Sequence, residues 1–166
     1  MEESVALRSY FQAHKQEMID TLAAWVAVPS VRGDAKPGMP YGAEPARMLK
    51  LALEQCAALG FQTESVANCM GSVELNDLPA ALAVLCHLDV VPAGEGWSQD
   101  PFVLIYRQDT DRLYGRGAID NKGPAVAALY AMRAIRELHI PMKHGVRLLL
   151  GTDEENGSSD LTAYLQ

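Results

Sequence analysis

Two apolar runs that end in polar side chains limit the choice of fold more than any other feature of this sequence. The first run, LAVLCHLDVV, spans residues 82–91, and the second, VRLLL, spans residues 146–150. A nearly continuous apolar run of this length is typical of a β-strand that is covered on both faces. We therefore expect one buried strand within residues 80–91 and another over residues 146–150.

Segments with helical spacing of apolar residues alternate with these two runs. We expect helices over residues 5–28, 46–59 and 124–138, and another from residue 159 onward. Shorter strands are expected over residues 61–66, 102–106 and 112–114, with a turn at 68–71 and a loop rich in proline and glycine over residues 29–45. Alternating helices and buried strands predict a layered α/β domain.

Composition and charge argue against several classes of partner. The formal net charge of −7 and the pI near 5.0 argue against nucleic acid or an anionic membrane as the main partner. No apolar run is long enough to span a membrane, and the start MEESVALRSYFQAHKQ lacks the pattern of a secretory signal. Three cysteines without CxxC spacing indicate neither a disulfide framework nor a zinc finger. We expect a cytoplasmic protein.

The first run places a histidine and an aspartate at the end of a strand. Alternation along the strand puts His87 and Asp89 on the same face. A neutral imidazole offers one nitrogen to a metal ion, and a nearby carboxylate can hold the other N–H. The alternative is a core histidine with an aspartate that caps a helix or lies in a turn, and this segment alone favours that alternative.

A second polar segment, LYGRGAIDNKGP, precedes the helix expected from residue 124. Asp120 could cap that helix, since aspartate is preferred at this position. Capping does not account for the glycines at positions 115, 117 and 123, which suit a backbone that passes close to another group. The GxxxxGK(S/T) order of a phosphate-binding loop is absent.

The third segment, LLLGTDEENGSSD, places Asp153, Glu154 and Glu155 directly after the second run. Two unit charges about 5 Å apart repel each other by roughly 3 kcal/mol at an effective dielectric near 20. A solvated acidic turn would relieve this repulsion by screening, and a bound divalent cation would reverse it. A calcium loop of the EF-hand type is excluded, because Gly157 and Ser158 fall at the wrong positions.

Together the three segments offer one imidazole and several carboxylates. Mixed nitrogen and oxygen ligands suit zinc, with manganese or cobalt as alternatives. Two adjacent glutamates can divide the work, one binding metal and the other acting as a base toward water.

The motifs HLDVVPAG, WxxDPF, LYGRGAIDNKGP and GTDEENGSSD, in this order, resemble the metallopeptidase superfamily of acetylornithine deacetylase, succinyl-diaminopimelate desuccinylase, carboxypeptidase G and carnosinase. Their extended forms are most similar to bacterial carnosinase-like Xaa-His dipeptidases. The resemblance implies a zinc-peptidase-like α/β domain, with a mixed sheet flanked by helices. It also implies metal-dependent hydrolysis of the amide bond of a small peptide.

Carried over by position, the resemblance implies a role for each polar residue. His87 would bind one metal ion, and Asp89 would orient its imidazole. Asp120 would bridge two divalent ions, and the peptide bond after it would be cis. Glu154 would be the general base, and Glu155 would bind the second ion.

The resemblance also implies that residues 1–166 form only the N-terminal part of a catalytic domain. Family members continue into a lid domain, which often carries the dimer contacts, and into further metal ligands. We therefore expect the chain to be inactive alone and the parent enzyme to be a homodimer. The alternatives are an N-acyl amino-acid deacylase or carboxypeptidase of the same superfamily, and a truncated, non-catalytic module that binds metal or a partner.

Overall fold

The computed structural model describes residues 2–166, with side chains described from residue 4 onward. The helices are α1 (Glu2–Ala13), α2 (Lys15–Val26), α3 (Ala43–Ala58), α4 (Lys122–Glu137), α5 (Ser159–Tyr164) and the short 3₁₀ helix η1 (Glu154–Asn156). The strands are β1 (Gln62–Val66), β2 (Met70–Glu74), β3 (Ala80–His87), β4 (Ile105–Arg107), β5 (Arg112–Tyr114) and β6 (Gly145–Gly151). None of the helices in this range is long and apolar enough to cross a membrane.

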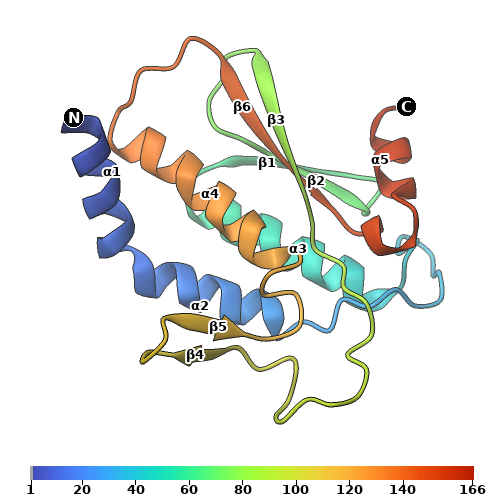
Figure 1. The fold of residues 1–166 in the computed structure, drawn as a ribbon. Coiled ribbons are helices and arrows are strands. Elements are labelled where there is room, and N and C mark those ends of the chain that lie inside the picture. The colour runs from blue at the N-terminus through green and yellow to red at the C-terminus, as the bar shows by residue number, and fades with distance from the viewer. Residues whose placement is uncertain (1) are drawn as a thin grey trace.

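Four of the strands form a mixed sheet in the order β1-β2-β6-β3 (Figure 1). The β3 and β6 strands are parallel, whereas β1 pairs with β2, and β2 with β6, in antiparallel fashion. The β4 and β5 strands form a separate hairpin near α2, away from this sheet. The predicted α/β domain with a mixed sheet flanked by helices is confirmed.

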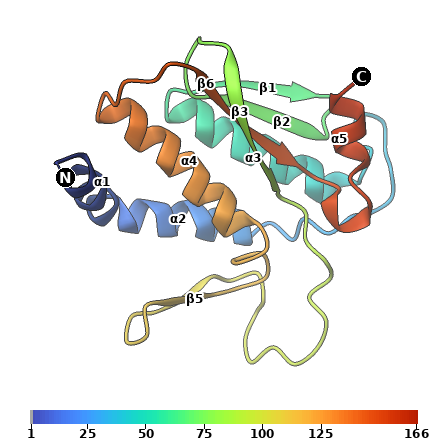
Figure 2. The same cartoon turned by 45° about the horizontal axis from the view of Figure 1, so that its top comes forward.

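The core lies between the sheet and the helices α2, α3 and α4, which cover one of its faces (Figure 2). Trp25 from α2, Leu49 from α3 and Leu129 from α4 have no exposed surface, and neither have Leu148 and Leu150 from β6. The α5 helix packs near β2 at the other side of the sheet. Burial of these large apolar side chains holds the layers together.

Several secondary-structure predictions are corrected. The strand expected over residues 102–106 is only Ile105–Arg107, and the helix expected from residue 46 begins at Ala43, inside the expected loop. The helix expected over residues 5–28 is interrupted at His14, whose Nδ1 lies 2.8 Å from the carbonyl oxygen of Tyr10 and whose ring stacks on that tyrosine. A side chain that binds a helix carbonyl in this way favours a bend. The turn expected at residues 68–71 is shorter, because Met70 already begins β2.

The expected burial of both apolar strands is right for β6 and wrong for much of β3. The β6 strand lies inside the sheet and is buried along most of its length. The β3 strand lies at the edge, where Leu82 and Leu85 are 56% and 53% exposed.

The parallel pair determines where the polar segments meet. His87 at the end of β3 is aligned with Gly151 at the end of β6. Both strands therefore deliver their following residues to the same edge of the sheet, which is where α/β proteins commonly bind ligands. The amino end of α4 lies opposite this edge.

Candidate metal centre

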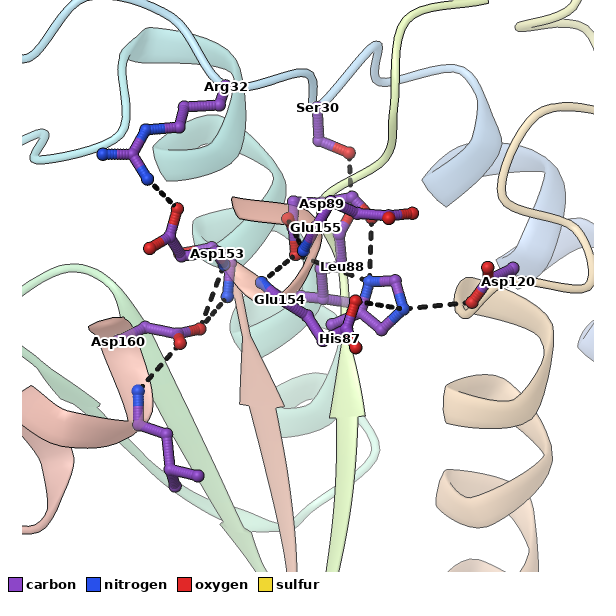
Figure 3. A network of polar contacts seen from close by, with 12 residues as sticks. Ser30, Arg32, His87, Leu88, Asp89, Asp120, Asp153, Glu154, Glu155 and Asp160 are labelled. Atoms are coloured by element: carbon purple, nitrogen blue, oxygen red, sulfur yellow. Dashed lines mark hydrogen bonds and ion pairs between the residues drawn. The ribbon is translucent and has the colours of Figure 1, made fainter. Parts of the chain in front are cut away.

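His87 is the last residue of β3 and is held in one orientation by its neighbours. Its Nδ1 lies 3.0 Å from the backbone carbonyl oxygen of Asp89. A carbonyl oxygen can only accept a hydrogen bond, so Nδ1 carries the proton and donates. In the neutral ring, Nε2 is then the free nitrogen, and it faces Asp120 and Glu154 (Figure 3). A histidine ligand oriented through its second nitrogen is typical of metal sites.

Asp89 is fully buried, and its carboxylate holds the turn that carries the two glutamates. The backbone N–H groups of Glu154 and Glu155 donate to its two oxygens, at 3.2 and 3.1 Å. One of these oxygens also lies 3.4 Å from Nδ1 of His87. Asp89 therefore positions both the imidazole, chiefly through its backbone carbonyl, and the start of η1.

Asp120 approaches the imidazole from the amino end of α4. Its Oδ1 lies 3.1 Å from Nε2 of His87, and the peptide bond between Asp120 and Asn121 is cis, as predicted. The capping alternative for Asp120 is wrong. The α4 helix begins at Lys122 rather than at residue 124, the cap position belongs to Asn121, and no side chain there caps the helix.

The carboxylates of Glu154 and Glu155 have different surroundings. His87, Asp120 and Glu155 each offer one ligand atom, and these three atoms all lie within 4.8 Å of one another. Glu154 stands beside this group, with Oε2 at 3.8 Å from Nε2 of His87 and with a side chain that is 55% exposed. A cavity of about 280 Å³ opens at this point and is lined by His87, Asp120 and Glu154, among others.

The charges at the site favour a cation. Burial lowers the pKa of His87, but hydrogen bonding to Asp89 and Asp120 and the charge of Asp89 outweigh burial and raise the pKa to about 9. Burial and the charge of Asp120 raise the pKa of Glu155. Both groups therefore hold a proton more tightly than usual, Glu155 chiefly because it is partly buried and His87 because carboxylates surround it. A divalent ion offers the same compensation with more charge, so the side chains present fit a metal ion.

Asp153 is the first of the three consecutive acids. It points away from His87, Asp120 and Glu155, which the sequence did not indicate. It is buried, pairs with Arg32 and accepts a 2.5 Å hydrogen bond from Ser159 Oγ. Asp160 is buried as well and accepts the backbone N–H groups of Thr152 and Asp153. These contacts fix the start of the turn from the side opposite to Asp89 (Figure 3). The one sequence signal for this structural role of Asp160 was its position at the end of the GTDEENGSSD motif.

A model of the peptidase family M20/M25/M40 matches residues 83–166, half of the chain. This range includes the predicted site residues His87, Asp89, Asp120, Glu154 and Glu155. The chain belongs to this family. The M20 membership confirms the resemblance inferred from the four motifs.

Single proteins similar to this chain carry the names of dipeptidases and of a carboxypeptidase. A Bacillus subtilis protein named "Putative dipeptidase YtjP" is 38% identical over 144 residues, which are 86% of this chain and 31% of that protein. The structure of human carnosine dipeptidase 1 matches with a TM-score of 0.81 and 29% identity, over 99% of this chain and 37% of that one. An M20 family metallo-carboxypeptidase from Sulfolobus solfataricus gives a TM-score of 0.72 and 26% identity, over 90% of this chain and 33% of that one. The chain thus spans about a third of the length of these M20 relatives.

Proposed function

We propose that this chain belongs to a metal-dependent dipeptidase and carries part of its metal centre. The observation that carries the proposal is the convergence of His87, Asp120 and Glu155 within 4.8 Å of one another, at the polar edge of an M20 domain. The site would hold two divalent ions, with Asp120 between them. Zinc suits the mixed ligands best, and manganese or cobalt are the alternatives.

The side chains divide the chemistry of amide hydrolysis among them. Divalent ions at this site would polarise the scissile carbonyl and acidify a water molecule. His87 would bind through Nε2, because Nδ1 is committed to Asp89. Asp89 would act as a positioning residue, since its carboxylate holds the backbone of both glutamates.

Glu154 would be the general base, and Glu155 would be a ligand. Glu154 lies outside the converging group, faces the cavity and is exposed enough to reach a water molecule. A carboxylate in this position can take a proton from water and pass it to the leaving amine.

The substrate class rests on the relatives. The Bacillus subtilis relative is named a dipeptidase, and a solved neighbour is a carnosine dipeptidase. We therefore propose a dipeptide as substrate. The match to a metallo-carboxypeptidase supports a second candidate, cleavage of the last residue from a peptide, and an N-acyl amino acid is the third substrate class of the same chemistry.

We further propose that residues 1–166 are the N-terminal part of a larger catalytic domain and are inactive alone. The one-third coverage of the relatives supports this extent. So does the apolar edge strand β3, whose sequence suits a strand covered on both faces. The rest of the parent enzyme would supply further ligands, a lid and the contacts of a homodimer. A truncated, non-catalytic module is the competing possibility of another class.

Calorimetric titration of the chain with Zn²⁺ tests the metal centre directly. The wild-type chain is expected to bind zinc, and His87→Ala is expected to lose the binding because it removes the only nitrogen ligand of the group. Asp109→Asn, in the exposed turn between β4 and β5, is the matched control and is expected to bind as the wild type does. Zinc binding that survives in His87→Ala would contradict the proposed centre.

A further inference from the structure

A lysine close to the metal group is buried completely. Lys122 is the first residue of α4, two positions after Asp120, and its side chain has no exposed surface. Its Nζ donates hydrogen bonds to the backbone carbonyl oxygens of Trp25 and Val28, at 2.9 and 2.8 Å. In the described part of the chain no ion pair involves this amine. Lysine is rarely buried in this way, because the ammonium group must give up its water.

The carbonyl of Trp25 belongs to the last turn of α2, and that of Val28 belongs to the segment that follows this helix. The segment after α2 also holds the end of β3. Ser30 Oγ donates a 2.6 Å hydrogen bond to the carbonyl of Leu88, and the N–H of Val90 donates to the carbonyl of Ser30 (Figure 3). Leu88 lies between His87 and Asp89. A continuous set of hydrogen bonds therefore runs from the Asp120 turn, through Lys122 and the segment after α2, to the strand end that presents the imidazole.

Close packing makes this connection stiff. The N–H of Lys122 donates to the carbonyl of Gly117 at 3.0 Å, which closes the turn around Asp120. A Cβ atom on Gly117 would lie 2.9 Å from Val90 Cγ1 and 3.1 Å from Lys122 Cδ. The lysine stem and Val90 thus both pack closely against the backbone at Gly117, and close packing limits their movement.

We propose that Lys122 is a positioning residue of the metal centre. Its hydrogen bonds connect the Asp120 turn to the segment after α2, which is itself hydrogen-bonded to the end of β3. Lys122 thereby fixes the separation between the Asp120 carboxylate and Nε2 of His87. The inference rests on the proposed metal site and adds a residue that does not touch the metal. A lysine that merely capped the end of α2 would stabilise the fold without changing the affinity for metal.

Titration with Co²⁺, followed by its visible absorption, separates these two roles. Lys122→Met keeps the apolar stem and removes the donors. We expect it to weaken Co²⁺ binding at least about tenfold, as loss of groups that orient metal ligands does, and to change the cobalt spectrum. Lys50→Met, on the exposed face of α3, is the matched control and is expected to leave both unchanged. Urea unfolding in the presence of a chelator measures the stability of each chain separately from metal binding.

A second variant covers the case in which Lys122→Met does not fold. Ser30→Ala removes a single hydroxyl from the same set of hydrogen bonds and is expected to weaken Co²⁺ binding in the same direction. A folded Lys122→Met chain with the affinity and spectrum of the wild type would overturn the proposal. If that variant is unfolded, wild-type binding by Ser30→Ala would overturn it instead. A wild-type chain that binds no Co²⁺ would overturn the metal centre itself, and the role of Lys122 with it.

Discussion

Glu154 and Glu155 are neighbours in the sequence, yet their carboxylates occupy different places in the site. Asp89 accepts the backbone N–H groups of both, so η1 begins in a fixed orientation. From there Glu155 reaches the group formed with His87 and Asp120, whereas Glu154 stays beside it and faces the cavity. One short turn can therefore supply a ligand and a base.

Glu154→Gln is expected to lower kcat for dipeptide hydrolysis by about 10²–10⁴-fold in the complete enzyme, because an amide cannot accept the proton from water. The metal content should stay at the wild-type value. Both can be measured on the same preparation, by steady-state kinetics and by elemental analysis, with Glu95→Gln in an exposed loop as the control. Loss of metal from Glu154→Gln would make Glu154 a ligand and would require another base.

Among single residues, the sequence indicated the candidate ligands that lie at the end of an apolar run or in a glycine-rich turn. His87, Asp120 and Glu155 could be singled out because each follows an apolar run or a glycine-rich turn. The second role of Asp89 and the pairing of Asp153 with Arg32 could not be predicted. They depend on contacts between segments more than 60 positions apart, such as Asp89 with Glu154 and Arg32 with Asp153.

The helices and strands were predictable wherever their apolar spacing was regular. The α4 helix and the β6 strand lie close to their expected bounds. Their regular apolar residues are buried by packing against the elements beside them, so the spacing alone indicates the element. The bend at His14 was missed because it arises from a contact between side chain and backbone within the helix. The exposure of β3 was missed because an apolar sequence shows that a strand can be buried. It does not show whether the strand lies at the edge of the sheet or inside it.

A polar cluster joins three of the helices and should make stability depend on pH. Arg133 of α4 pairs with Glu137 at 2.7 Å and with Glu17 of α2 at 2.6 Å, and Tyr10 of α1 donates to Glu137. The hydrogen bond from Arg133, opposed by partial burial and aided by Tyr10, holds the pKa of Glu137 below its usual value. A carboxyl whose pKa is lower in the folded state stabilises the fold above its unfolded pKa and loses that effect as the pH falls through the folded pKa.

Glu137→Gln is therefore expected to lower the free energy of unfolding at pH 7 by about 0.3–1 kcal/mol, since the pair is partly exposed. The difference from the wild type should shrink as the pH falls below about 4.5, where the unfolded carboxyl is protonated. Urea unfolding at pH 7 and at pH 3.5 measures both effects. Glu64→Gln, on exposed β1, serves as the control. A difference that is equal at the two pH values would show that the charge of Glu137 contributes nothing.

For the whole molecule, the proposed extent of the domain leads to a simple measurement. The polypeptide isolated from its natural source is expected to have an intact mass well above 18.0 kDa, the mass of these 166 residues. The reasons are the one-third coverage of the relatives and the exposed apolar edge at Leu82 and Leu85. A natural product of 18.0 kDa would contradict the proposed domain extent and would favour the non-catalytic module.

The parallel pairing of β3 with β6 also has a consequence for how the chain folds. The two strands belong to distant parts of the sequence, so their pairing requires closure of a long loop, a slow and entropically costly step. The proposed ligands come from the ends of these strands and from the turn before α4, so they are brought together only after that closure. Metal ions would then bind the finished fold and not the unfolded chain, which makes them stabilisers by mass action. Removal of metal by a chelator should accordingly lower the free energy of unfolding of the chain.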